Sequence, residues 1–196
     1  MSEGLPDVYV RFEGIEGECM DDKHPGKAGW FPIKSFNFNF SVKDAGDSEK
    51  PSEDKKGGDK KKAAPKAAAR DEGPLSHPDV SLSKNLDSSS ARIWDTKCYS
   101  GQEILEVELE ACRSGGMSGA DKIPFVRLVF EGVYIKSISM SIAEDALPAE
   151  TMQFSYERAR IESIWTDNDT GERCNTQPRI FGWDFENHKQ WTGYDE

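Results

Sequence analysis

The 196-residue sequence has few apolar residues and a shortage of basic charge. Hydrophobic residues make up 36% of the chain, below the roughly 45–50% of a typical globular domain. The deficit is concentrated in residues 43–78, so the remainder can still bury a core. Lys and Arg number 25 against 36 Asp and Glu, giving a net charge of −11. Such a chain repels phosphate backbones and anionic lipids, so we expect neither nucleic acid nor membrane as a partner.

Export and membrane signals are also missing. No run approaches the ~18–20 apolar residues of a membrane span, and the first residues lack the basic and apolar regions of a Sec signal peptide. We therefore expect a cytoplasmic protein that, if it is exported, leaves through a dedicated secretion machine without a cleaved signal peptide.

Cysteine and histidine are too few and too scattered for a recognisable metal motif. The chain has four cysteines, Cys19, Cys98, Cys112 and Cys174, without a Cys-x-x-Cys pair and without a histidine at zinc-ligand spacing. An even count would allow two disulfides, but a chain of this size does not need them, so reduced thiols are favoured. The sequence predicts no metal and no cofactor.

Nucleophilic motifs are absent as well. The histidines His24, His77 and His188 fall in predicted loops or near the C-terminus, beside no obvious nucleophile. Ser118 lacks the Gly-x-Ser-x-Gly frame of a nucleophile elbow. No Gly-Lys-Ser/Thr follows the glycines of 115–119, so this segment predicts a turn rather than a phosphate loop.

Two acidic segments are further candidates for a binding or catalytic site. Residues 167–172 hint at a calcium loop, but they lack the third acidic ligand before the Gly and the Glu six residues after it, so a hairpin turn is predicted. Glu106, Glu108 and Glu110 share one face of a strand. Three like charges in a row usually mark a solvated face, not a carboxylate site. The sequence predicts no catalytic residue and no enzyme activity.

The sequence does contain strand-period alternation. Apolar and polar residues alternate in Val8–Glu13, and Gly132 interrupts a long apolar run as a bulge or bend would. A single short helix is predicted over 91–99, with Ser88–Ser90 as its N-cap. Strands are predicted at 8–13, 31–42, 80–86, 103–112, 125–140, 152–165 and 179–185. This pattern predicts a mainly β fold: a closed β-barrel or two-sheet sandwich with one short α-helix packed on the outside.

The strand at 31–42 has two contrasting faces. Phe36, Phe38 and Phe40 line one face, and the other carries small uncharged polar residues: Ser35, Asn37, Asn39 and Ser41. The chain then enters residues 43–78, which contain Lys and Ala runs and no aromatic residue. Such a segment cannot offset its ordering entropy, so we predict one domain over 1–196 with a disordered charged insertion at 43–78. A solvated loop is favoured there over a docking tail.

Several segments, taken in order, resemble one known family. Residues 7–17 and the loop with His24 match its opening strand, and Asp79–Lys84 matches its Asp-x-x-x-x-Lys strand. Cys98–Gly101 fits its Cys-x-x-Gly helix ending, and Tyr156–Ile161 and Gly182–Asp184 fit its later strands. In these segments the chain resembles the haemolysin-coregulated protein (Hcp) family of bacterial type VI secretion systems. The likeness covers everything except 43–78 and the tail.

The resemblance implies a tube subunit. Hcp proteins form hexameric rings that stack into a tube, which a contracting sheath drives outward with a spike at its tip. The implied partners are further copies of itself, the spike, sheath and baseplate proteins, and effector proteins carried in the lumen. Ser35, Asn37, Asn39 and Ser41 would line that lumen or simply face solvent. Alternatives are a tube protein of a phage tail or other contractile injection system, or a non-enzymatic binding module.

If 43–78 is only a solvated insertion, its deletion should leave ring assembly intact. The measurement is native mass of the deletion variant beside the full chain. Loss of rings in the variant would show instead that the segment is an assembly element.

Overall fold

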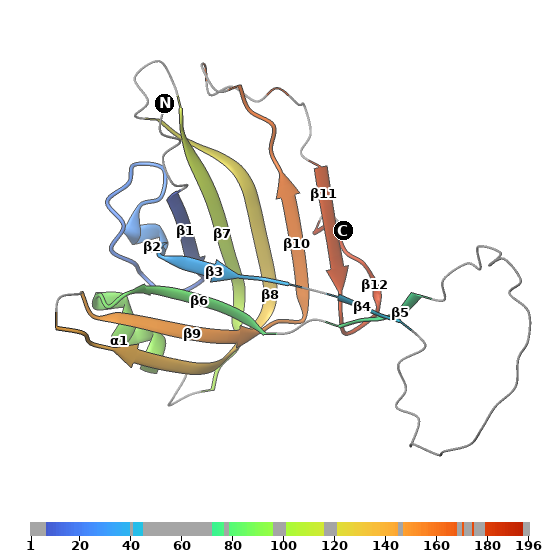
Figure 1. Cartoon of the computed structure of the whole chain (residues 1–196), viewed down its shortest axis with the longest axis horizontal. Helices are drawn as coiled ribbons and strands as arrows, with labels where there is room; N and C mark the ends of the chain where they lie inside the picture. Colours follow the sequence, from blue (N-terminus) through green and yellow to red (C-terminus); the bar gives the residue numbers. More distant parts are fainter. Residues whose placement is uncertain are drawn as a thin grey trace, which may run out of the picture. The chain divides into compact units, whose positions relative to one another are not determined.

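Figure 1 shows the computed structural model of the chain, which describes residues 7–39, 41–44, 72–76, 79–95, 101–115, 121–144, 147–167, 170, 174 and 179–193. For 41–44, 72–76, 114–115 and 121 it describes the backbone alone. The chain divides into two compact units, residues 1–38 with 78–196, and residues 39–77.

The larger unit is mainly antiparallel sheet, as predicted. It contains one α-helix, α1 (Ser88–Asp95), and a short 3₁₀ helix, η1 (Gly26–Ala28). Its strands are β1 (Asp7–Phe12), β2 (Trp30–Ile33), β3 (Ser35–Asn37), β6 (Val80–Asn85), β7 (Ile104–Gly115), β8 (Asp121–Ser141), β9 (Ala149–Ser155), β10 (Arg158–Ser163), β11 (Arg179–Asp184) and β12 (Lys189–Gln190).

Strand pairing closes this unit into a barrel. β8 pairs with β9, β9 with β6, and β6 with β3. On the other side β8 pairs with β7, β7 with β1, and β1 with β2. Lys34, between β2 and β3, donates its N–H to the Ser83 carbonyl at 2.7 Å, so the chain passes from one sheet to the other at that corner. β10 pairs with the N-terminal half of β8, along the same edge that β9 uses further on, and β11 and β12 follow β10 in the sheet.

The 21-residue strand β8 serves both sheets because it bends at Gly132. Residues Val126–Glu131 pair with β10, whereas Tyr134–Ser141 pair with β9. Gly132 lies between these segments with φ +65°, a left-handed conformation that favours glycine. A Cβ there would lie 2.7 Å from the side chain of Glu157. This confirms the bend predicted from the sequence.

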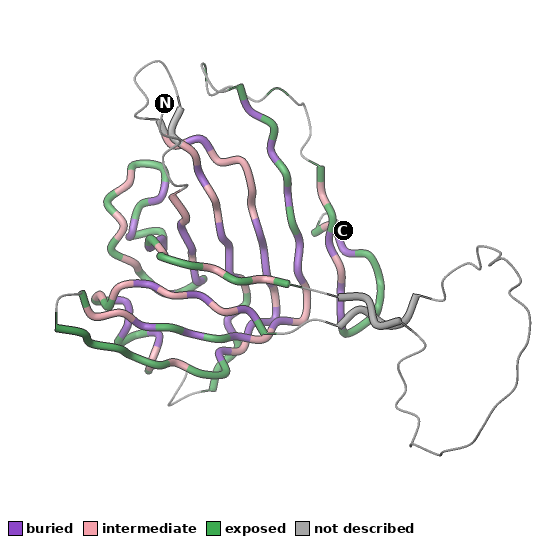
Figure 2. The backbone as a smooth tube through the Cα atoms, in the orientation of Figure 1, coloured by how far each residue is buried: buried purple, intermediate pink, exposed green. Residues whose placement is uncertain are grey.

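Aromatic side chains fill the barrel. Phe12, Phe31, Phe130 and Phe154 are fully buried, and Figure 2 shows buried positions alternating along β6 and β9. Phe130 packs against Phe154 and Tyr156 at ring centroid distances of 5.6 and 5.1 Å. Phe36 and Phe38 also contact Phe130, as their shared face predicts. Phe40 lies outside the described residues.

A buried ion pair closes the end of the barrel beneath α1. Lys84 and Glu150 are both fully buried, with Nζ and Oε1 2.9 Å apart. Lys84 also contacts Asp87 Oδ1 at 2.7 Å. Ser90 Oγ and Trp94 Nε1, both on α1, donate to the two Glu150 oxygens at 2.8 and 3.0 Å. Charges taken out of water must be paired, and here the pairing fixes the helix on the barrel.

The helix begins earlier than predicted. It starts at Ser88, and its N-cap is Asp87, whose Oδ1 accepts the Ser89 N–H at 2.9 Å. Ser90 Oγ in turn accepts the Asp87 N–H. The prediction that Ser88–Ser90 cap a helix starting at 91 was wrong, because Asp caps as well as Ser and serines also fit a first turn. The predicted helix end, including Cys98, lies outside the described residues.

The smaller unit contains a two-stranded antiparallel sheet, β4 (Ser41–Asp44) and β5 (Glu72–Ser76). The sequence places 72–76 within the disordered insertion, yet this segment forms a strand because its backbone pairs with β4. Residues 45–71, 77 and 78 lie outside the described residues, so the single-domain boundary stays a prediction.

Asp184 anchors the turn after β11. Its carboxylate accepts hydrogen bonds from the Asn187 N–H at 2.8 Å, from Asn187 Nδ2 at 3.0 Å and from Arg158 Nε at 3.0 Å. Burial would raise the pKa of Asp184, but the bonds from Asn187 and Arg158 outweigh it and lower the pKa to about 2. The carboxylate is therefore ionised in the folded protein at neutral pH.

Replacing Lys84 by Met should lower the free energy of unfolding by about 3–5 kcal/mol, because it leaves the Glu150 charge buried without its cation. Urea denaturation measures this, with Lys34→Met at an exposed lysine as the control. Equal stability of the two variants would mean that the buried pair is not a determinant of the fold.

Asp184 should make folding sensitive to acid. Its folded-state pKa lies below the ordinary 3.8, so its stabilisation is present above pH 3.8 and is lost as pH falls toward about 2. Asp184→Asn should remove about 1.5–3 kcal/mol at neutral pH and flatten the stability curve in that window. Denaturation at several pH values checks both effects. If the unfolding free energy of the variant falls with acid as steeply as that of the wild type, the acid sensitivity comes from other groups facing Arg158, such as Glu131.

Candidate functional surfaces and a buried histidine cluster

One side of the barrel is a neutral polar face. It lies on β3, β6, β9 and the C-terminal half of β8, on the surface opposite the core. Paired positions form three rows across these strands: Asn37, Ser81, Gln153 and Ser137; Ser35, Ser83, Thr151 and Ser139; and Asn85, Ala149 and Ser141. None of these residues is ionisable, in a chain with a net charge of −11. We call this set the polar face.

Cross-strand hydrogen bonds hold several of these side chains. The Ser35 and Ser83 hydroxyls lie 2.6 Å apart, and Ser137 Oγ donates to Gln153 Oε1 at 3.2 Å. Ser139 Oγ donates to the Thr151 carbonyl at 3.4 Å. The face is therefore wet and hydrogen-bonded but carries no charge.

Two of the four lumen residues predicted from the sequence lie on the polar face. Ser35 and Asn37 do, whereas Asn39 belongs to the smaller unit and the side chain of Ser41 lies outside the described residues. Sequence reasoning missed the residues that β6, β8 and β9 contribute. Their signal was present, because Ser81 and Ser83 alternate with Leu82 just as Ser35 and Asn37 flank Phe36.

The other sheet carries a charged ladder on its outer surface. Glu108 on β7 pairs with Arg11 on β1 at 2.7 Å and with Arg127 on β8. Arg127 also faces Glu162 on β10 at 3.8 Å, and Glu162 lies 2.9 Å from Arg160. Burial would lower the pKa of Arg127, but the hydrogen bond and charge of Glu108 raise it above its usual value. Opposite charges thus alternate across four strands.

This ladder overturns the prediction of a solvated glutamate face. Glu108 is only 4% exposed, and Glu106 and Glu110 are partly buried. Glu106 pairs with Arg11, and Glu110 with His24. The reason is that the like charges of one strand lie opposite arginines of its neighbours, which the strand alone does not reveal.

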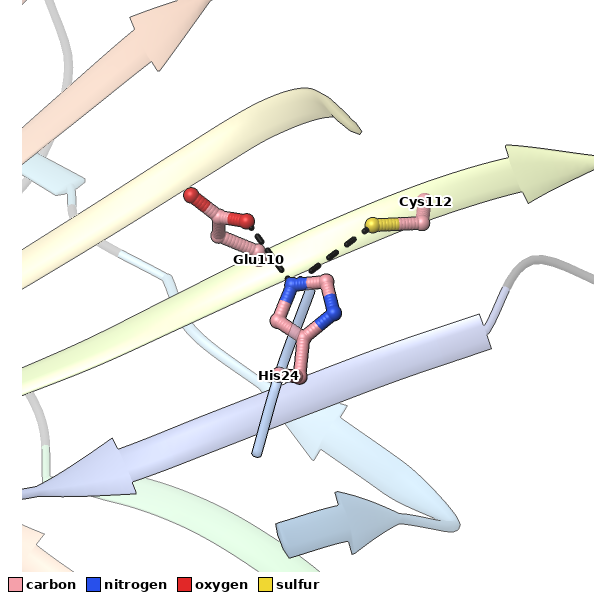
Figure 3. A group of neighbouring side chains, drawn as sticks. All are labelled: His24, Glu110 and Cys112. Atoms are coloured by element: carbon pink, nitrogen blue, oxygen red, sulfur yellow. Dashed lines mark hydrogen bonds and ion pairs between the residues drawn. The ribbon is translucent and has the colours of Figure 1, made fainter. Parts of the chain in front are cut away.

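The loop between β1 and β2 folds back over this sheet and buries His24. The ring stacks on Tyr9 at a centroid distance of 4.1 Å and meets Trp30 edge-on at 4.8 Å. Nδ1 lies 2.9 Å from Asp21 Oδ1, and Nε2 lies 2.9 Å from Glu110 Oε2. Nε2 is also 4.0 Å from Cys112 Sγ, and Figure 3 shows the ring directed toward both Glu110 and Cys112. The prediction that His24 lies beside no nucleophile was wrong, since folding brings Cys112 to it across 88 positions.

Electrostatics favour a charged ring at this place. Burial lowers the pKa of His24, but hydrogen bonds to Cys112, Glu110 and Asp21 outweigh it and raise the pKa to about 10. Burial and the nearby Asp21 charge raise the pKa of Tyr9 to about 12. With Cys112 fully buried, the arrangement holds a loop in place and offers no access to a substrate.

The other sequence candidates lie only partly within the described residues. His188 is exposed in the turn before β12. His77 and Ser118 lie outside the described residues. Asp167 Oδ1 accepts the Thr170 N–H at 2.9 Å, and the other residues of 167–172 lie outside the described residues, so the hairpin turn stays a prediction. Cys19 and Cys112 are free thiols.

An apolar patch lies where the larger sheet extends past the polar-face strands. Ile161 on β10 and Phe181 on β11 are paired neighbours, 37% and 45% exposed. Trp165, just after β10, is 68% exposed. Ile161 and Phe181 lie side by side, and adjoining exposed apolar residues are typical of an interaction surface. Within the described part of the chain, no helix is long and apolar enough to span a bilayer.

The barrel and its order of strands agree with one family. A sequence profile described as "Type VI secretion system effector, Hcp" matches residues 9–162. The chain belongs to the Hcp family. It is therefore a structural, non-enzymatic tube protein of a type VI secretion system, as the sequence predicted. No curated protein matches the sequence.

Solved structures share the Hcp fold. A type six secretion system protein is 22% identical, with a TM-score of 0.74 over 95% of this chain and 100% of its own. Hcp1 from Salmonella typhimurium is 19% identical, with a TM-score of 0.66 over 95% and 99%. A type VI secretion system effector from Yersinia pestis is 15% identical, with a TM-score of 0.62 over 91% and 99%. At these identities the likeness concerns the fold alone.

The charged ladder should stabilise this Hcp protein even at high salt, because buried pairs are screened little. Glu108→Gln should lower the free energy of unfolding by about 1–3 kcal/mol, in low and high salt alike. The exposed pair of Glu16 with Arg92 provides the control. Glu16→Gln should cost about 0–1 kcal/mol, and nothing at high salt. Denaturation curves at two salt concentrations test this, and a salt-sensitive Glu108 effect would contradict a buried ladder.

Proposed function

We propose that this protein is the subunit of a type VI secretion inner tube, in which hexameric rings stack and the polar face lines the lumen. Family membership supports the tube. The observation that carries the lumen assignment is the polar face itself, whose paired positions on four strands carry no ionisable side chain; the exposed Lys136 lies beside it in the bulge of β8.

The chemistry of the polar face suits a channel through which proteins travel. Small hydroxyl and amide side chains keep water at the wall, whereas apolar residues would retain cargo by burial and a charged wall would retain cargo of opposite sign. Several hydroxyls are already bonded across strands, so they compete weakly for passing groups. Effector proteins of differing charge can therefore occupy the same lumen.

The polar-face sheet has two edges that a ring can use. β3 and β8 flank it, and β6 and β9 lie between them. Identical subunits joined head to tail close into a ring when the rotation between them permits. Copies placed edge to edge would continue the four-stranded sheet around the lumen and would cover edges that otherwise invite uncontrolled pairing.

The apolar patch of Ile161, Trp165 and Phe181 supplies a second contact. It lies on the sheet that does not carry the polar face, and its exposure has a cost that a neighbouring copy would remove. Once assembled, the tube would be driven out by a contracting sheath from its baseplate, behind a spike. The subunit would then pass from the cytoplasm to the outside or into a target cell.

Native mass spectrometry with negative-stain microscopy of the purified protein tests the ring. We expect a mass of six subunits and hollow rings or stacked tubes. A monomer at high concentration, without rings, would refute the tube proposal.

The apolar patch gives a sharper version of this test. Phe181→Lys should shift the native mass toward monomer while leaving the circular dichroism spectrum unchanged, because a charge there cannot be buried between copies. Phe181→Leu, which keeps an apolar side chain, should still form rings. If Phe181→Lys assembles as well as Phe181→Leu, the patch is not a contact between copies.

Chemical labelling tests the lumen. In a background with Cys19, Cys98 and Cys174 replaced by Ser, Ser139→Cys should react with a small maleimide in both subunits and assembled tubes. A maleimide carrying a large polymer should label dissociated subunits and spare the tubes, because the polymer cannot enter the lumen. Equal labelling of tubes by the large reagent would place Ser139 on the outer wall.

A further inference from the structure

Three different metal-binding side chains converge beneath the loop between β1 and β2. His24 comes from the loop, and Glu110 and Cys112 come from the same face of β7 (Figure 3). One donor atom from each lies within 4.8 Å of the other two. His24 is 2% exposed and Cys112 is fully buried, so these donors are enclosed rather than scattered over a surface.

The arrangement around His24 resembles the support that metal-bound histidines receive. Asp21 Oδ1 lies 2.9 Å from Nδ1, which directs the other ring nitrogen, Nε2, toward Glu110 and Cys112. A carboxylate on the second nitrogen fixes the tautomer and the ring orientation in many zinc sites. Tyr9 and Trp30 hold the ring plane from two sides.

The distances are close to those of a tetrahedral zinc ion. Bond lengths of about 2.0 Å to nitrogen and oxygen and about 2.3 Å to sulfur place neighbouring ligand atoms roughly 3.3–3.6 Å apart. Nε2 lies 2.9 Å from the Glu110 oxygen and 4.0 Å from Cys112 Sγ, and all three donor atoms lie within 4.8 Å of one another, so the side chains would have to shift to reach the zinc spacing. Glu110 Oε1 faces Arg127 at 3.8 Å, and the oxygen toward His24 is Oε2.

The charge of the cluster also permits an ion. Asp21 and Glu110 each place an acceptor oxygen 2.9 Å from a ring nitrogen, so without metal both nitrogens of His24 donate. Zinc binds deprotonated ligands, so an entering Zn²⁺ would displace the Nε2 proton and the thiol proton. Two protons leave as one ion enters, so no uncompensated charge is buried.

We propose that His24, Glu110 and Cys112 supply three ligands for one Zn²⁺ ion, with Asp21 orienting the histidine. An imidazole, a thiolate and a carboxylate together suit zinc better than calcium or magnesium, which prefer oxygen ligands alone. The ion ties the loop between β1 and β2 to β7 and so fixes the edge of the charged ladder.

Metal titration of the chelator-treated full chain tests the site. Cobalt(II) should produce a thiolate-to-metal charge-transfer band that saturates at one ion per chain, and Zn²⁺ should abolish the band by displacement. Cys112→Ser should lose the band, whereas Cys174→Ser, at an exposed thiol, should keep it. A wild-type chain without the band, or Cys112→Ser with an undiminished band, would overturn the proposal.

Two further variants keep the test decisive if Cys112→Ser does not fold. Asp21→Asn and Glu110→Gln change partly exposed carboxyls and preserve their shape. Loss of the orienting carboxylate should weaken zinc binding about 10–100-fold, and loss of the ligand charge at Glu110 should weaken it at least as much. Unchanged zinc affinity in both variants would show that the histidine is held by hydrogen bonds alone and would refute the site.

Discussion

The fold depends on one strand that belongs to two sheets. β8 pairs with β7 along one edge, while its other edge pairs first with β10 and then with β9. The change of partner occurs at Gly132, where a positive φ bends the strand and Glu157 occupies the space a side chain would need. Without that bend, β9, β6 and β3 could not fold back over the larger sheet, and the barrel would remain open.

Closing the barrel gives its two sheets outer surfaces of opposite chemistry. The polar face is neutral and solvated, whereas the other sheet bears a ladder in which Glu108 and Glu162 lie between arginines. The tube that we propose would use both properties. The neutral face suits a channel wall, and a rigid, internally paired charged surface keeps its shape because few of its charges remain to be satisfied by solvent.

Apart from the charged ladder, several buried polar groups of this small barrel lie at its connections. Lys84 and Glu150 join α1 to the barrel end, Asp184 and Arg158 hold the turn after β11, and His24 fastens the loop between β1 and β2. Each fastening joins segments distant in sequence and costs stability if one partner is removed. This distribution keeps the core apolar while the connections are fixed by directional bonds.

The sequence by itself predicted most of the strands, the bend at Gly132, the family and the neutral alternation around Phe36, but it joined β2 with β3 and β9 with β10 into single strands and missed β5 and β12. These follow from local rules, since side chains on a strand alternate between two faces. Only the tertiary structure decided what covers each face. The sequence predicted that Glu108 faces solvent, whereas in the structure Arg11 and Arg127 lie opposite it. It placed His24 in a loop without partners, whereas in the structure the ring of this loop residue lies between Asp21 and Glu110. Alternation predicts which residues share a face, but the partners on that face come from neighbouring strands and returning loops.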